Sequence, residues 1–245
     1  MFKIFKPKTD KIKDLSILYP RVIEELETIL AGRTNIYIDF SNVIFWQNKI
    51  NWHIDIKRLK QFLNSFETVE KIYIYYGKLK GDDYSEKLIK KLEDYSYEVK
   101  SKPVKIMPLS IDVSSIKINS PSLLENFIKK SLLSKLNLED IEYLNGKLKK
   151  LNDQGIKFLE QRKCNFDVEM GIDITIDSMS DIDNFILWTE DSDFEGPVRS
   201  IIEKGKKATL FMTARRVSSE LSQTGVRKFE IKKIKEFICW NKELD

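Results

Sequence analysis

The sequence predicts an α/β fold with a largely parallel central sheet and an inserted helical element. Three observations predict this class. Short apolar runs rich in β-forming residues alternate with segments of helical period, which is typical of parallel strands connected by helices. The 245 residues are 42% hydrophobic and 11% aromatic, which is enough to bury a core. One stretch, 110–161, interrupts the alternation with helical patterns.

The first half of the chain alternates between the two patterns. Residues 14–30 place apolar side chains three or four positions apart, which is the helical period, and Gly32 follows as a C-cap. Residues 35–40 form a β-rich apolar run that stops at Asp39. The next expected elements are a helix at 54–66, a strand at 71–76, a helix at 84–95 and a strand-like stretch at 97–109.

The second half begins with the segment that breaks the rhythm. Pro121 opens a helical pattern that reaches 133, and a lysine-rich helical pattern covers 138–159, so we expect a helical insertion at about 110–160. We therefore divide the chain into an N-terminal helical extension, 1–32, and one domain, 33–245, that contains the insertion. The remaining expected elements are a helix at 166–179, a strand at 185–189, a helix at 195–204 capped by Gly205, a strand at 208–212, a short helix at 218–223 and a last strand or helix at 229–240.

Cysteine usage and apolar patterning exclude several classes of protein. Only two cysteines occur, Cys164 and Cys239, without the paired spacing of a structural zinc site or a disulfide framework. No run of about 18 apolar residues occurs, and lysines interrupt the apolar residues at the N-terminus. We therefore expect a cytoplasmic protein with neither a signal peptide nor a membrane span.

Charge is distributed unevenly along the chain. The formal net charge is +4, yet residues 164–195 hold ten acidic residues and no lysine or arginine. The other 213 positions consequently carry a net charge of +14. This pattern suits a protein that attracts a polyanion through its basic surface and binds divalent cations at one acidic point. Alternatively, the lysines are only a solubility feature of a lysine-rich composition.

Acidic residues stand at the ends of two predicted strands. Asp39 ends the first strand, Asp191 and Asp193 follow the strand at 185–189, and Asp167 lies in the first turn of another predicted helix. Because the carboxyl ends of parallel strands meet at one edge of a sheet, these acids can converge. Converged carboxylates repel one another unless a divalent cation neutralises them, and oxygen ligands suit Mg²⁺ or Mn²⁺. Metal-assisted phosphoryl chemistry is therefore the hypothesis.

Each of these acids also has a structural explanation. Asp39 could cap the turn after its strand, and Asp191 or Asp193 could be acids at the N-terminus of the following helix. Three further acids recur on one face of the helix at 166–179, where a solvated surface is the simpler interpretation: Glu169, Asp173 and Asp177.

Three blocks of sequence carry a resemblance to a known family. They are IYIDFSNV at 36–43, KCNFDVEMGID at 163–173 and LWTEDSDFEGPVRSIIEKGKKATLF at 187–211. In these blocks the chain resembles the NYN domain ribonucleases of the PIN-like nuclease superfamily. The resemblance implies a PIN-like three-layer α/β/α sandwich with a central, mostly parallel sheet, and Mg²⁺- or Mn²⁺-dependent hydrolysis of RNA by an activated water. RNA is then the expected partner, and a homo-oligomer is left open.

The matching positions imply a set of site residues. The expected catalytic and metal-binding residues are Asp39, Asp167, Asp191 and Asp193. Asn42 and Thr189 would orient these carboxylates, and Asp173 would be either a supporting acid or an extra ligand. The candidates for contact with the RNA backbone are Lys163, Arg199, Lys206, Arg215 and Arg216.

Departures from the family pattern leave other functions open. Glu190 stands where the family has a small residue, and Cys164 and Asn165 stand where it has a glycine. A non-catalytic RNA-binding or protein-interaction module is therefore the alternative. A haloacid dehalogenase phosphatase is disfavoured, because Glu195 rather than Thr or Val stands two residues after Asp193.

Aromatic residues offer a further way to bind RNA. Trp46 and Trp52 lie in the expected loop after the first strand and are open candidates for base stacking. Tyr73 and Tyr75 alternate within a predicted strand, which favours core packing. His53 is the single histidine and precedes a predicted helix, so we expect a capping or surface residue.

Overall fold

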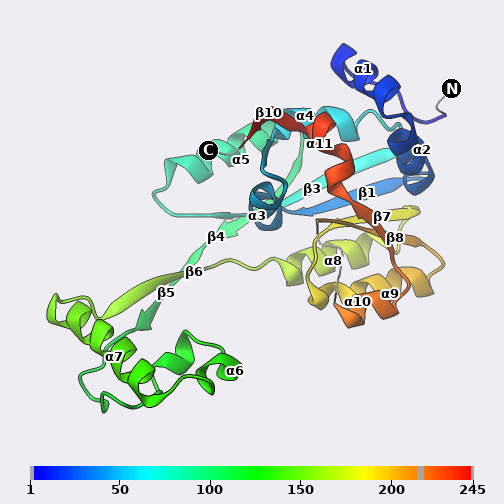
Figure 1. Cartoon of the computed structure of the whole chain (residues 1–245). Coiled ribbons are helices and arrows are strands. Elements are labelled where there is room, and N and C mark those ends of the chain that lie inside the picture. Colours follow the sequence, from blue (N-terminus) through cyan, green and yellow to red (C-terminus); the bar gives the residue numbers. More distant parts are fainter. Residues whose placement is uncertain (1–2, 214–217, 244–245) are drawn as a thin grey trace. The chain divides into compact units, whose positions relative to one another are not determined.

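The computed structural model describes residues 3–213 and 218–243. The chain divides into two compact units (Figure 1). The first comprises Met1–Pro103 with Asn165–Asp245, and the second comprises Val104–Cys164. The expected helical insertion thus falls inside a unit of its own. None of the described helices is long and apolar enough to cross a bilayer.

A six-stranded parallel sheet is the centre of the first unit. Its strand order is β4-β3-β1-β7-β8-β9, and every pair of neighbours is parallel. This confirms the α/β class with a parallel central sheet that the sequence predicts. The strands are β1 Thr34–Asp39, β3 Val69–Lys78, β4 Glu98–Pro103, β7 Asn184–Trp188, β8 Lys207–Met212 and β9 Arg227–Glu230.

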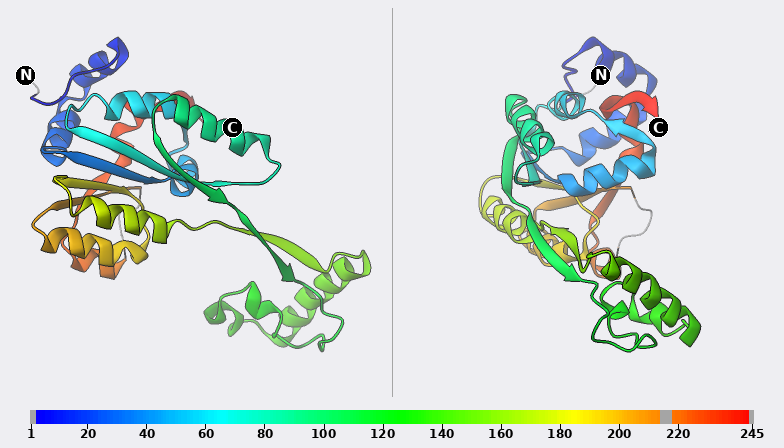
Figure 2. Two further views of the ribbon diagram at one scale, coloured as in Figure 1. Left: turned by 180° about the vertical axis from the view of Figure 1, so that it is seen from behind. Right: turned by 90° about the vertical axis from the view of Figure 1, so that its left-hand side faces the viewer.

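Helices cover both faces of this sheet, as Figures 1 and 2 show. On one face lie α2 Pro20–Ile29, α3 Phe40–Ile50, α4 Ile56–Leu63, α5 Asp83–Asp94 and α11 Lys235–Ile238. On the other face lie α8 Asp167–Asp177, α9 Glu195–Glu203 and α10 Ser219–Gln223. The arrangement is that of a PIN-like α/β/α sandwich.

Side-chain alternation along β1 assigns its residues to the two faces. Ile36 and Ile38 point into the large apolar core beneath α2 to α5, while Asn35, Tyr37 and Asp39 point toward α8. Because successive side chains of a strand point to opposite faces, one strand supplies both core and polar contacts. The side of β1 that faces α8 is therefore its polar side.

The N-terminal helix predicted at 14–30 is instead two helices, α1 Asp10–Leu18 and α2. Pro20 separates them, because proline lacks the N–H that a helix interior requires and drives the preceding residue out of helical geometry. Tyr19 accordingly has φ −123° and ψ 53°. Ile23 and Leu26 are buried in the main core, so the two helices form part of the first unit.

The second unit is an antiparallel ribbon with short helices. Strands β5 Lys105–Ser110 and β6 Phe158–Lys163 pair along their whole length. Leu124, Leu133 and Ile141 form a small separate core. The helices of this unit are η1 Leu124–Asn126, α6 Lys130–Leu133 and α7 Leu138–Asp153.

Two expectations about this region were wrong. The stretch at 97–109 is two strands that belong to different sheets, β4 and β5. The helical pattern at 138–159 ends with α7 at Asp153, and its last residues enter β6. Gly155 stops the helix because it adopts φ +84°, a left-handed conformation that glycine accommodates without strain.

The remaining elements complete the first unit. The helix α3 was missed, and the helix expected at 54–66 begins at Ile56, because Asp55 caps it by accepting hydrogen bonds from the backbone N–H groups of Lys57 and Arg58. The C-terminal segment is a strand, a short helical turn and a final strand that pairs with an early one. The helical turn includes η3 Ile231–Ile234, the final strand is β10 Cys239–Glu243, and it pairs with β2 Trp52–Ile54. A further short turn, η2 Ser192–Phe194, lies between β7 and α9.

Candidate metal centre

Three carboxylates meet at the carboxyl edge of the sheet. One carboxylate oxygen from each of Asp167, Asp191 and Asp193 lies within 4.8 Å of the other two. Asp191 and Asp193 follow β7, and Asp167 begins α8. The hydrogen bond from the backbone N–H of Asp193 to the Oδ1 of Asp191 (3.1 Å) holds the loop that carries both acids. These three predicted residues therefore converge in the structure, although Asp167 is more than 20 positions from the other two in the sequence.

Asp39 lies beside this group but outside the 4.8 Å set. Its Oδ1 accepts the backbone N–H of Ser41 at 3.0 Å, and its Oδ2 accepts the Nδ2 of Asn42 at 2.9 Å. Burial raises the pKa of Asp39, and the charge of Asp167 raises it further. Asp39 thus caps α3, as the structural explanation held, and also faces the acidic group.

The same electrostatic pattern holds for Asp167. Burial raises its pKa, and the charges of Asp191 and Asp193 add to this effect. A raised pKa means that the ionised form is costly in this environment, because burial and the neighbouring carboxylates both disfavour its negative charge. A divalent cation bound by oxygen ligands would remove that cost. The donor set consists of oxygen atoms and fits Mg²⁺ or Mn²⁺ chemically.

Asn42 and Thr189 lie where the sequence placed them, next to the acids. The Nδ2 of Asn42 is 3.5 Å from the Oγ1 of Thr189, and this oxygen accepts the backbone N–H of Asp191 at 3.2 Å. Thr189 is fully buried. One chain of hydrogen bonds consequently connects Asp39 at the end of β1 with Asp191 at the end of β7.

The acidic face of α8 packs on the sheet. The Oδ2 of Asp173 accepts the hydroxyl of Tyr75 at 2.9 Å, and the Oδ2 of Asp177 accepts the hydroxyl of Tyr37 at 2.6 Å. Burial raises the pKa of both tyrosines, and the neighbouring carboxylates raise it further. A solvated helix face is therefore the wrong interpretation for these two aspartates. Asp173 supports the helix rather than joining the three-carboxylate group.

Two lysines that the sequence analysis missed lie beside the acids. Lys102 on β4 forms an ion pair with Glu169 at 2.5 Å and lies over the ring of Phe166, 4.7 Å from its centroid. Lys100 forms an ion pair with Asp173 at 3.5 Å. Lys100 and Lys102 are two positions apart on β4, so their side chains lie on the same face of the strand. Their contact with α8 could not be predicted, because it depends on where β4 lies in the sheet. Lys102 also acts to lower the pKa of Asp167.

The predicted RNA contacts that the structure describes lie on different elements. Arg199 pairs with Glu195 on the exposed side of α9. The Nζ of Lys206 donates to the backbone carbonyl of Ser180, at the edge of the sheet where β7 begins, so the structure does not bring Lys206 to the acidic group. Lys163 is exposed on β6 of the second unit. Arg215 and Arg216 lie outside the described residues.

Other candidates have structural roles. Trp46 is fully buried in α3 and packs against Trp188, 6.2 Å between ring centroids, so the expectation that it is free to stack on bases was wrong. Its position in a helix rather than a loop is the reason. The Oε1 of Glu190 accepts both the backbone N–H and the hydroxyl of Thr213, at 2.6 and 2.7 Å. The departure from the family pattern at Glu190 thus joins the loops after β7 and β8.

The sheet and its flanking helices form a nuclease-like α/β fold, with the acidic group at the carboxyl edge of the sheet. The family model described as the NYN domain matches residues 126–230, which confirms the resemblance. The match spans Asp167, Asp191 and Asp193 and begins after Asp39.

Two further comparisons concern whole chains. A solved structure from Vibrio parahaemolyticus RIMD 2210633, a protein of unknown function, has a similar fold. The TM-score is 0.50 at 16% identity, covering 82% of this chain and 94% of that protein. At this identity the likeness is one of fold. No curated protein matches this sequence.

Proposed function

We propose that this chain is a Mg²⁺- or Mn²⁺-dependent endoribonuclease. The observation that carries the proposal is the meeting of Asp167, Asp191 and Asp193 within 4.8 Å at the carboxyl edge of a parallel sheet. The NYN domain match over the same residues supports RNA as the substrate. The sequence holds only two cysteines, without the spacing of a disulfide framework, which is in keeping with a reducing, cytoplasmic location.

The residues of the site would have two roles, binding the cation and holding the carboxylates in place. Asp167, Asp191 and Asp193 would bind the cation, and Asp39 would complete the negative environment from the end of β1. Bound there, the ion would supply an activated water and neutralise charge that develops on the scissile phosphate. Asn42 and Thr189 keep the acids in place through the hydrogen bonds described above.

The test is an RNA cleavage assay with purified full-length chain and a generic single-stranded RNA. We expect cleavage with Mg²⁺ or Mn²⁺, and none with EDTA, because removal of the ion removes both the nucleophile and the charge compensation. Asp191→Asn should abolish cleavage. Asp181→Asn is the matched control, since Asp181 belongs to the same acidic segment but pairs with Arg33 instead. Cleavage that survives both EDTA and Asp191→Asn would refute the proposal. RNA binding without cleavage in any metal would favour the non-catalytic module.

A further inference from the structure

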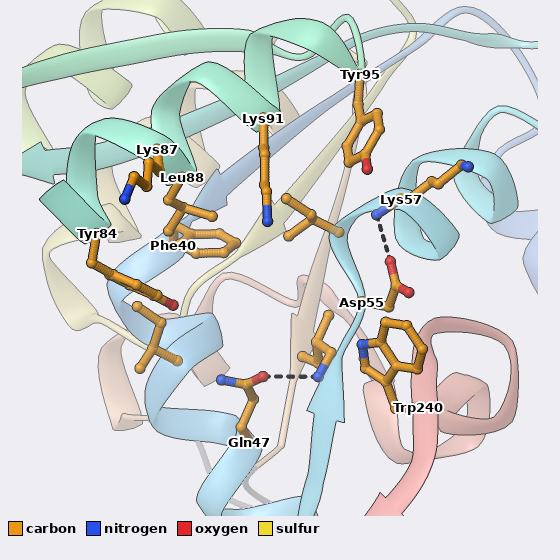
Figure 3. A pocket seen from close by; sticks show the side chains of 13 residues that line it. Phe40, Gln47, Asp55, Lys57, Tyr84, Lys87, Leu88, Lys91, Tyr95 and Trp240 are labelled. Atoms are coloured by element: carbon orange, nitrogen blue, oxygen red, sulfur yellow. Dashed lines mark hydrogen bonds between the residues drawn. The ribbon is translucent and has the colours of Figure 1, made fainter.

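A separate pocket lies in the first unit, on another side of α3. Its volume is about 490 Å³, which is within the usual range for a ligand site. Phe40, Ile44 and Gln47 line it from α3, three or four residues apart and so on one side of that helix. Asn42, which faces the acids, lies on the opposite side by the same helical spacing. The rest of the lining comes from β2, α4, α5 and β10 (Figure 3).

Aromatic side chains stand at both ends of this pocket. Tyr84 on α5 is 67% exposed and Trp240 on β10 is 57% exposed. Figure 3 shows them on opposite sides of the pocket, with Phe40 near Tyr84 and Tyr95 above Trp240. Large aromatic rings left open to solvent around a pocket are surfaces on which nucleobases can stack.

The charge of the pocket is positive. Lys57, Lys87 and Lys91 line it. In Figure 3 the side chain of Lys91 reaches toward Phe40, whereas the side chains of Lys57 and Lys87 point away from it, and Lys87 pairs with Asp83. Within the described part of the chain, neither Lys57 nor Lys91 has an ion-pair partner. Among the lining residues that the structure describes, Asp55 has the only carboxylate, and its Oδ1 already accepts the hydrogen bonds that cap α4. An anionic group is therefore the missing partner of this pocket.

We propose that this pocket binds a nucleotide of single-stranded RNA, with the phosphate at Lys91 and the base against Trp240. The inference rests on the proposed function, because it treats RNA as the ligand. Asp39 caps the same helix that lines the pocket, and an α-helix is about 10–12 Å across. One strand of RNA can thus contact the pocket and the acidic group on either side of α3. The combination of lysines with aromatic rings favours RNA over an acidic peptide, which would not use the rings for stacking.

Binding is measured on full-length chain that carries Asp191→Asn, so that the RNA is not cut. The probe is a short single-stranded oligoribonucleotide, and AMP and a polyglutamate peptide are tested in parallel. The pocket variants are Lys91→Glu and Trp240→Ala. The matched control is Lys90→Glu, which makes the same charge change on the neighbouring residue of α5, outside the pocket lining. Thermal melts verify that each variant is folded.

We expect Lys91→Glu and Trp240→Ala each to weaken oligoribonucleotide binding at least about tenfold, equivalent to about 1.4 kcal/mol. Lys90→Glu should change affinity less than about threefold, which is the general electrostatic effect. Equal losses for Lys90→Glu and Lys91→Glu, or unchanged binding by Trp240→Ala, would overturn the assignment. AMP binding as tightly as the oligomer would assign the pocket to free nucleotides, and equal competition by polyglutamate would assign it to acidic peptides; either result would overturn the RNA proposal.

Cleavage assays separate this inference from the proposed function. If the chain with intact Asp191 never cleaves RNA but the pocket variants lose binding, the endoribonuclease proposal fails and the pocket assignment stands. If Lys91→Glu in the intact chain cleaves the oligomer with unchanged KM and kcat, the pocket assignment fails and the endoribonuclease proposal stands.

Discussion

Removing one charge from the acidic group should change thermal stability in opposite directions with and without metal. The perturbation is Asp193→Asn, which keeps the shape of the side chain. Two unit charges 4.8 Å apart repel by about 0.9 kcal/mol in a fully aqueous environment and by about 3.5 kcal/mol at an effective dielectric constant of about 20. Asp193 is exposed, so the aqueous value is appropriate, and its two neighbours together contribute about 2 kcal/mol of repulsion at low salt.

One effect opposes this relief. Asp193 lies just before α9, where a negative charge stabilises the helix dipole by about 0.3–1 kcal/mol. The net expectation in EDTA is a variant about 1 kcal/mol more stable than the wild type, a rise in Tm of about 2–4 °C. With Mn²⁺ at about 100 times Kd, the wild type gains about 2.7 kcal/mol. A variant with about hundredfold weaker affinity gains only about 0.4 kcal/mol, so the order of stability should reverse.

The assay is a set of thermal melts at low ionic strength, in EDTA and in Mn²⁺, with Asp181→Asn as the control for loss of an acid elsewhere in the segment. A loss of stability for Asp193→Asn that is equal in both buffers would identify Asp193 as a helix N-terminal acid alone. That result would refute its place at a metal site.

Four further predictions concern three buried residues. Tyr37→Phe should lower the free energy of unfolding by about 1.5–3 kcal/mol, measured in urea, because Asp177 loses a buried hydrogen bond to its carboxylate. Trp46→Ala should cost about 3–5 kcal/mol of stability through the cavity it leaves; unchanged stability with weaker RNA binding would mean that Trp46 stacks on bases instead. Burial raises the pKa of the Cys239 thiol to about 12, so iodoacetamide at pH 8 should spare it in the native protein, as read by mass spectrometry. Because its folded pKa exceeds the unfolded value of about 8.5, stability should also fall as the pH rises above that value, a decrease that Cys239→Ala should reduce.

Much of the fold could be predicted because it depends on local patterns. Short apolar runs became β1, β3, β7 and β8, since the hydrophobic period is a property of neighbouring residues. The position of acids at strand ends was equally visible, because parallel strands present their carboxyl ends at one edge. The same reasoning failed where two local signals competed. The helix α3 begins directly after β1, so the local pattern did not distinguish it from a loop. The burial of Trp46 within that helix was missed for the same reason.

The sequence by itself determined the parallel α/β class, the acidic segment and the candidate acids at the strand ends, because each is a matter of composition or local period. Only the tertiary structure decided which acids converge. Asp167, Asp191 and Asp193 meet through the packing of α8 beside the end of β7, whereas Asp173 is held by Tyr75 on β3. The same holds for the pocket, whose lining comes from five elements between Phe40 and Trp240. Such contacts join residues far apart along the chain, and their distances depend on strand order and helix packing, which no local pattern specifies.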